Sequence, residues 1–195
     1  MRRPQQGMTI VEILITLAII GMIMALAGPS AGVWIQNLQL RNAADGVVAG
    51  LQQAKLEALK RNTLVMFQLT DPASTAWNIC IYDPLTDTCK AATASLASRS
   101  PSEGSPNARL ASEVNPTPDP TTALAPGVGI PGTMTFDSFG RQAPTASANF
   151  TRVDVRNPTL STANERRLVI LVNSAGQIRM CDPKLVKAVN PQGCV

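Results

Sequence analysis

The 195-residue sequence predicts an α+β fold, in which one long, kinked N-terminal helix packs on an antiparallel β-sheet domain. Three observations support this prediction. A run without charged residues extends from Ile13 to Leu40, an amphipathic helical pattern follows, and short alternating segments separated by turn residues fill the rest of the chain. A chain of this length is expected to form about one domain.

The first apolar segment has the properties of a membrane anchor. Its most apolar part, Ile13 to Ala27, is close to the shortest length that spans a bilayer. Arg2 and Arg3 precede it, as basic residues also precede the core of a secretory signal peptide. A signal peptide does not explain Glu12, because a carboxylate at the edge of an apolar helix is costly unless it is paired or lies near the interface.

The helical pattern continues beyond a Gly28-Pro29 pair. Proline removes a backbone donor and clashes with the preceding turn, so a kink or a locally non-helical stretch is expected at Pro29. Over residues 36–62, apolar residues recur at steps of three and four, which indicates an amphipathic helix with one face on a core. The whole helix is expected to extend from about Thr9 to Asn62.

Several segments after the helix show the alternation of β-strands. They are TLVMFQL from Thr63, WNICIY from Trp77, GTMTFDSFGR from Gly132, NFTRVDVR from Asn149, RRLVILVN from Arg166 and GQIRMC from Gly176. Short strands separated by turns predict antiparallel pairing in a β-rich region, residues 63–195. A stretch rich in Ser, Pro, Thr and Ala, about residues 91–131, is expected to be a long irregular loop.

The chain has four cysteines, Cys80, Cys89, Cys181 and Cys194, which allow three disulfide pairings. Local pairing is favoured, because Cys80–Cys89 would close a loop across a turn and Cys181–Cys194 would close the last loop. Four free thiols are the alternative, which an oxidising compartment disfavours. Zinc is not expected, because the sequence has no histidine and no two cysteines separated by two residues.

The composition argues against an enzyme. The absence of histidine removes His-based acid–base catalysis and His-containing triads, and the sequence has no glycine-rich phosphate loop. Acidic pairs such as Asp83 and Asp87 fit turn positions. We therefore expect no catalytic residue, no metal and no cofactor.

Charge is unevenly distributed along the chain, whose net charge is +4. From Gln36 to Gly140, seven Lys and Arg oppose nine Asp and Glu, a net charge of −2. From Arg141 to Val195, eight oppose three, a net charge of +5. This C-terminal part would form either a solvated, arginine-rich sheet face or a basic surface for an anionic partner.

The segment GMTIVEILITLAIIGMIMAL, from Gly7 to Leu26, resembles the N-terminus of type IV prepilins, which type IV pilins share with type II secretion pseudopilins. The resemblance implies that a prepilin peptidase cleaves between Gly7 and Met8 and that the new amino group of Met8 is methylated. It makes Glu12 the glutamate that members of the family carry at the fifth mature position. In a filament this carboxylate would pair with the N-terminal amine of a neighbouring subunit and set the register of assembly.

The resemblance also implies the organisation of the chain. Residues 1–7 would be the leader peptide, residues 8–35 the transmembrane and filament-core helix, and residues 36–195 a periplasmic domain. Before assembly the subunit would cross the bacterial inner membrane once, and it would then join other pilins in a pilus or pseudopilus. Arg2 and Arg3 would hold the leader in the cytoplasm.

The β-rich half resembles the GspH/FimT branch, through TFDSFGR from Thr135 and LVILVNSAGQIRMC from Leu168. This branch implies a minor pilin acting in pilus assembly or initiation, or alternatively a GspH-like minor pseudopilin of a type II secretion system. In FimT-like members a Gly-Arg-x-Arg motif is associated with DNA binding during transformation. Here the matching residues are Gly176-Gln177-Ile178-Arg179, so one of the two arginines is present.

A basic loop held by a disulfide could present cations to DNA phosphates. The candidate contacts are Arg179, Lys184, Lys187 and Arg141. Such binding would be weak, sensitive to salt and independent of sequence. The alternative is that Arg179 pairs with Asp182 or with a carboxylate of a neighbouring subunit.

Overall fold

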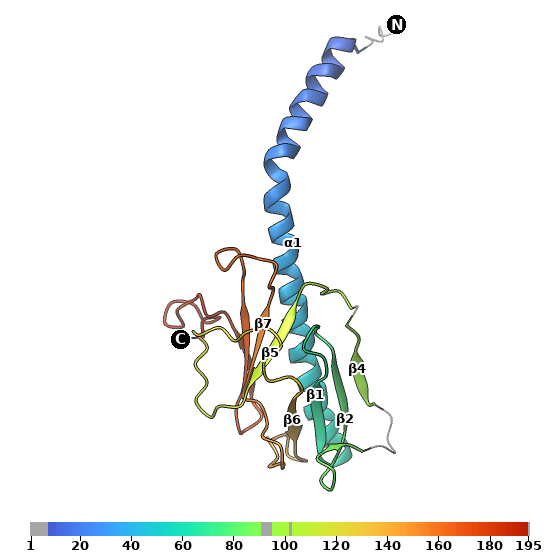
Figure 1. The fold of residues 1–195 in the computed structure, drawn as a ribbon, viewed down its shortest axis with the longest axis vertical. Coiled ribbons are helices and arrows are strands. Elements are labelled where there is room, and N and C mark those ends of the chain that lie inside the picture. Colours follow the sequence, from blue (N-terminus) through green and yellow to red (C-terminus); the bar gives the residue numbers. More distant parts are fainter. Residues whose placement is uncertain (1–7, 91–94, 102, 195) are drawn as a thin grey trace, which may run out of the picture. The chain divides into compact units, whose positions relative to one another are not determined.

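The structure is a computed structural model that describes residues 8–90, 95–101 and 103–194, with the backbone alone for residues 26–30. Helix α1 spans Ile10–Arg61 and is followed by β-strands (Figure 1). The strands are β1 (Val65–Leu69), β2 (Trp77–Asp83), β3 (Thr88–Cys89), β4 (Ala97–Arg99), β5 (Arg109–Glu113), β6 (Gly132–Phe136), β7 (Arg152–Arg156), β8 (Leu168–Val172) and β9 (Ile178–Cys181). The chain divides into two compact units, Met1–Ile35 and Gln36–Val195.

Both ends of α1 have recognisable caps. The Oγ1 atom of Thr9 accepts a hydrogen bond of 3.3 Å from the backbone N–H of Glu12, which places a Thr-x-x-Glu sequence in the first turn. Asn62 adopts a φ of 50° and ends the helix, as asparagine often does in the left-handed region. The predicted helix boundaries are therefore confirmed.

The backbone of α1 stays helical through Gly28 and Pro29. The locally non-helical stretch that the sequence allowed at Pro29 is not seen, and the kink stays a prediction. Among the described residues, no helix combines the length and apolar character that a membrane-spanning segment needs.

Two antiparallel sheets lie along the second half of α1 (Figure 1). The first has the order β3-β2-β1-β6, with β4 also paired to β2, and the second has the order β5-β7-β8-β9. Alternate residues of β1, β2, β6, β7 and β8 enter the core that the helix shares, as the predicted alternation requires. In β7, Val153 and Val155 are buried in the core, whereas the charged residues of this strand point to the opposite face.

One hydrophobic core joins the second half of α1 to both sheets. From the helix it contains Leu40, Ala43, Ala44, Val47, Leu51, Ala54 and Ala58. Gly50 allows the helix to approach the first sheet closely, because a Cβ there would come within 2.7 Å of the Phe67 ring. Phe67 and Trp77 pack beside it with ring centroids 5.4 Å apart. The predicted α+β fold, with a helix packed on an antiparallel sheet domain, is confirmed.

The prediction of an irregular loop over residues 91–131 is wrong for two segments, because β4 and β5 lie within it. Strand β5 pairs with all of β7 in the second sheet, from Arg109 opposite Arg156 to Glu113 opposite Arg152. Its sequence, RLASE, has few residues with high β-propensity. Pairing with a strand far along the chain therefore decides its conformation, which a local pattern does not reveal.

Candidate functional site

The N-terminal part of α1 presents one carboxylate among apolar side chains. Glu12 is exposed in the first turn of the helix, where a negative charge interacts favourably with the helix dipole. Its neighbours Val11 and Ile13 are exposed as well, at 64% and 45%. Within the described part of the chain, the structure shows no hydrogen bond or ion pair to the carboxylate of Glu12. A positive group from outside these residues is therefore needed to pair with it.

Both predicted disulfides are confirmed. Cys80 and Cys89 are joined with their Cα atoms 5.5 Å apart, and Cys181 and Cys194 with theirs 5.0 Å apart. The second bond ties the end of β9 to the C-terminal tail. The tail also pairs with the strand end in parallel, because the N–H of Asp182 donates to the carbonyl of Gln192 at 2.8 Å. The last loop of the chain is therefore fixed at both ends.

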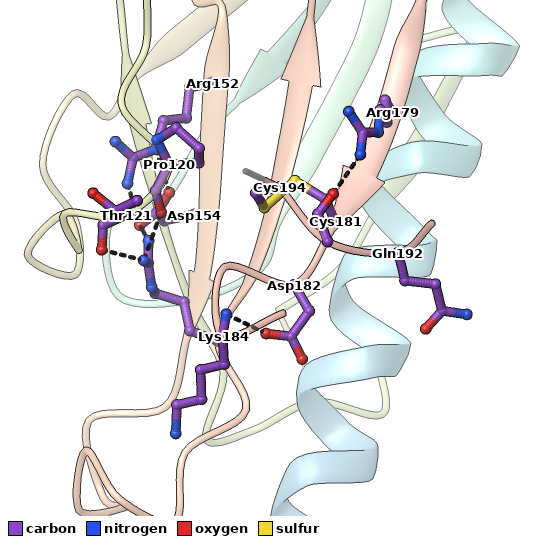
Figure 2. The surroundings of a disulfide bond; sticks show 12 residues. Pro120, Thr121, Arg152, Asp154, Arg179, Cys181, Asp182, Lys184, Gln192 and Cys194 are labelled. Atoms are coloured by element: carbon purple, nitrogen blue, oxygen red, sulfur yellow. Dashed lines mark hydrogen bonds and ion pairs between the residues drawn. A yellow bond between two sulfur atoms is a disulfide. The ribbon is translucent and has the colours of Figure 1, made fainter. Parts of the chain in front are cut away.

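Two arginines of the basic C-terminal part lie in a buried ion-pair network on the second sheet (Figure 2). The guanidinium of Arg152 donates to both carboxylate oxygens of Asp154, at 2.7 and 2.9 Å. Arg167 donates to the same carboxylate at 2.5 Å. Glu113 accepts from Arg152 at 3.3 Å, so two cations face two carboxylates. All but Glu113 are buried, and such charges are tolerated because they are paired and fully hydrogen-bonded.

The same arginines fasten the segment between β5 and β6 to the sheet. Arg167 donates to the carbonyls of Pro120 and Thr121, at 2.7 and 2.9 Å, and Arg152 donates to the carbonyl of Thr122. The N–H of Leu124 donates to Asp154 at 3.1 Å. We call residues 119–124 the strap. Charge-assisted hydrogen bonds hold it, and its Pro120 is buried.

A second ion pair holds the end of β7. Arg156 donates to Glu165 at 2.8 Å and to the carbonyl of Leu124 at 3.2 Å. The hydrogen bond with Glu165 raises the pKa of the Arg156 guanidinium above its ordinary value. The expectation of a solvated, arginine-rich sheet face is therefore wrong for Arg152, Arg156 and Arg167, because carboxylates and strap carbonyls cover them.

Of the four candidate DNA contacts, three have partners within the chain. Arg179 donates to the carbonyl of Gly193. Lys184 donates to three backbone carbonyls of residues 162–165, the shortest at 2.8 Å to Glu165. Arg141 pairs with Asp137 at 3.1 Å. Lys187 is exposed on the last loop. The structure does not bring these four side chains together as one set of free cations, and DNA contact stays a prediction.

Gly176, which matches the glycine of the FimT-like motif, has a structural reason to be glycine. Its φ is +71°, and a Cβ there would lie 2.0 Å from the carbonyl oxygen of Gly140. Its own carbonyl accepts a hydrogen bond of 2.9 Å from the Nζ of Lys55 on α1. The turn between β8 and β9 is thus fixed against both the helix and the neighbouring loop.

The buried network was not predicted from the sequence, although the pattern of β7 carries a signal for it. In the segment RVDVR, Arg152, Asp154 and Arg156 alternate with two valines, so opposite charges share one face of one strand. The partners Glu113 and Arg167 come from other strands or loops, and no local spacing connects them to Asp154.

Comparisons with known proteins agree with this geometry. Residues 2–28 match the model of the prokaryotic N-terminal methylation motif, and residues 43–176 match the model of the family described as type II transport protein GspH. A search of curated proteins returned no match.

Among solved structures, the chain is similar to the type IV minor pilin FimU of Pseudomonas aeruginosa strain PAO1. In space group P21 the TM-score is 0.51 at 17% identity, covering 83% of this chain and 99% of the FimU chain. In space group P65 the TM-score is 0.47 at 18% identity, covering 80% and 99%. At 17% identity, the similarity to the structure in space group P21 establishes the fold alone. Because the family match extends over most of the chain and the methylation motif precedes it, the chain is a type IV pilin-like protein that belongs to the GspH family.

Proposed function

We propose that the chain is a minor pilin subunit of a type IV pilus that acts in pilus assembly or initiation. Prepilin peptidase cleaves between Gly7 and Met8, and the amino group of Met8 is methylated. Residues 8–35 anchor the subunit in the inner membrane, and residues 36–195 lie in the periplasm until the subunit joins other pilins in a filament. The prepilin motif and the family, whose members are structural pilins rather than enzymes, support this proposal.

One observation carries the proposal, the exposure of an apolar half-helix that holds a single carboxylate. The exposed residues include Met8, Ile10, Val11, Leu14, Ile15, Leu17, Ile19, Ile20, Met22, Ile23 and Met24. An apolar surface of this extent is unfavourable in water, so lipid or other helices must cover it. Both environments occur in turn when a subunit leaves the membrane and enters a filament.

Glu12 sets the axial alignment of each new subunit during assembly. In the low dielectric of a helix bundle an unpaired carboxylate is strongly unfavourable, whereas one paired with a cation is tolerated. The N-terminal amine created at Met8 is the cation that every processed subunit brings. Pairing it with Glu12 of a neighbour fixes the axial position at which each new helix packs.

A minor pseudopilin of a type II secretion system is the second candidate. The description of the matching family as a type II transport protein favours it. The N-terminal chemistry is the same in both, so the two candidates differ in the filament that the subunit joins. DNA uptake is a finer proposal for the pilus candidate, and exposed Lys187 is the residue that supports it most directly.

The experiment compares Glu12→Gln with Asp45→Asn in the native host, after deletion of the chromosomal copy. Asp45 is a matched control, because its carboxylate is also exposed on α1 and pairs with Arg41. Mass spectrometry of membranes should show both variants starting at an N-methylated Met8. Sheared filaments should contain the Asp45 variant and lack the Glu12 variant.

The deletion strain then separates the two candidates. Loss of surface pili with normal protein secretion supports the minor pilin, and loss of secretion with normal pili supports the pseudopilin. Normal incorporation of the Glu12→Gln variant into filaments would contradict the docking role. A chain that keeps its first seven residues in membranes would contradict the cleavage site.

A further inference from the structure

A groove of about 810 Å³ opens on the β domain, on a face that the assembly proposal does not use. Its walls come from the segment after β5, the segment between β6 and β7, and the turn between β8 and β9. Its polar lining includes Asn115, Asn149, Asn173, Gln177 and Arg179. This volume is within the range of protein pockets that bind a ligand.

The walls of the groove are fixed by hydrogen bonds before any ligand arrives. Thr151 Oγ1 donates to the carbonyl of Asn115 at 2.5 Å. Asn149 donates to the carbonyl of Ala143 at 2.7 Å. The N–H of Gln177 donates to the side chain of Asn173 at 2.9 Å. A ligand therefore meets a preformed surface and has little ordering cost to overcome.

Arg179 gives the groove its charge. It lies in one cross-strand row with Leu171 and Arg152, on the same face as the buried network. Glu113 and Asp154 neutralise Arg152, whereas the described residues that line the groove include no carboxylate. One N–H of Arg179 is used by the carbonyl of Gly193 (Figure 2), and the guanidinium has five N–H donors in all. The groove therefore favours a ligand with one anionic group.

The rest of the lining favours a polypeptide over a nucleic acid. Pro116, Pro118, Pro144 and Val114 give apolar contact. Asn149 and Asn173 are bonded within the wall, whereas the side-chain NH₂ groups of Asn115 and Gln177 make no hydrogen bond in the described part of the chain and can donate to a peptide backbone. A nucleic acid needs several cations along its phosphates and gains from aromatic stacking. The groove's described lining contains one cation and no aromatic side chain.

We propose that this groove binds an extended polypeptide segment, from another protein, that places one Asp or Glu carboxylate against Arg179. The apolar and amide-bearing walls contact the segment on either side of that carboxylate. The proposal does not depend on Glu12 or on filament assembly, so either can fail without the other.

The test uses the full chain in mild detergent and an array of seven-residue peptides with random flanking positions. Asp is fixed at the centre of one array, and Asn at the centre of a matched array. The best Asp peptides should bind at least about tenfold more tightly than their Asn counterparts, because a hydrogen bond to a charged group is stronger than one between neutral groups.

Two variants and one control locate the site. Arg179→Gln should abolish the preference for Asp, and Ala148→Glu should weaken Asp peptides by placing a negative charge on the exposed rim of the groove. Arg179→Gln loses the contact with Gly193 and can perturb the fold. Ala148→Glu changes an exposed residue, leaves the fold intact and therefore tests the groove independently. Lys187→Gln removes the same charge outside the groove and should leave the preference unchanged.

Three results would overturn the proposal. The first is an array without any Asp-dependent binder, and the second is an equal loss in the Arg179 and Lys187 variants. The third is binding of a duplex DNA probe that depends on Arg179 and displaces the peptides, which would assign the groove to nucleic acid.

Discussion

The two halves of helix α1 share a secondary structure and differ in what surrounds them. Leu14, in the first half, is 61% exposed, and Leu51, in the second half, is fully buried. Both halves are rich in helix-forming apolar residues. The second half finds its apolar partners in the two sheets of its own chain, and the first half has none of its own within the described residues.

The acidic residues of the β domain and of the first half of α1 also differ in their surroundings. The carboxylate of Asp154 in the β domain is fully buried and held by two arginines. Glu12 has no such partner in the part of the chain that the structure describes. The β domain pairs its buried carboxylate internally, whereas the first half of α1 leaves its apolar side chains and Glu12 exposed.

The largest expected effect comes from Asp154→Asn, which leaves Arg152 and Arg167 buried beside a neutral group. Breaking a buried ion pair by removing one partner costs about 3–5 kcal/mol of unfolding free energy. Urea unfolding of the full chain in mild detergent, followed by near-ultraviolet circular dichroism, measures this loss. Glu12→Gln is the control and should leave the transition of the β domain in place. A loss below about 1 kcal/mol in Asp154→Asn would mean that the network is dispensable.

Leu51→Ala and Leu14→Ala make the next comparison, with the same chemical change in each half of α1. Leu51→Ala should cost about 2–5 kcal/mol, because it removes buried surface and leaves a cavity. Leu14→Ala should leave the same unfolding transition unchanged, since its side chain is exposed. The same urea experiment measures both. Equal losses would show that the first half of α1 also contributes to the stability of the β domain.

A smaller effect is expected in the strap at low pH. The hydroxyl and amide of Thr121, with the hydroxyl of Thr122, lower the pKa of Asp119 from 3.8 to about 2. Because the pKa of Asp119 is lower in the folded form than in the unfolded chain, its ionised carboxylate stabilises the folded form above about pH 4. This stabilisation is lost as the pH falls from about 4 toward 2. Hydrogen exchange at the amide of Thr121 should therefore speed up over that range beyond the intrinsic pH effect. In Asp119→Asn this extra change should be absent.

The smallest effect is expected for DNA. Because Arg141 is paired with Asp137 and the four candidate cations are not brought together as one set, duplex DNA should bind more weakly than about 10⁻⁴ M at physiological salt. Lys187→Ala should reduce the salt dependence by about one phosphate contact at most. Tighter, salt-sensitive binding that disappears when Arg179, Lys184 and Lys187 are all changed to alanine would instead support a role in DNA uptake.

Much of the fold could be predicted from local patterns. The helix ends, the strands β1, β2, β6, β7, β8 and β9, and both disulfides follow from periodicity, caps and spacing. The short β3 pairs with β2 across the adjacent turn, where local Cys80–Cys89 pairing was expected. The strands β4 and β5 were not predicted, because they are short or weakly β-forming and depend on partners far along the chain. Asn62 and Leu110 illustrate the difference, since the helix stop at Asn62 is a local property, whereas the pairing of Leu110 with Val155 is not.

The candidate functional residues also divide into those that local sequence patterns predict and those that depend on the tertiary fold. The local pattern around Glu12, through its resemblance to type IV prepilins, predicts Gly7, Met8 and Glu12 as processing and assembly residues, and this stays a prediction. Only the tertiary structure decided the fate of the basic C-terminal part. The ion pair between Arg152 and Glu113 joins β7 to β5, which are far apart in sequence, and Arg152 and Asp154 are buried rather than exposed on a surface. The net charge of a segment can be summed from its sequence. Which charged side chains pair with each other depends on which strands are neighbours in the fold.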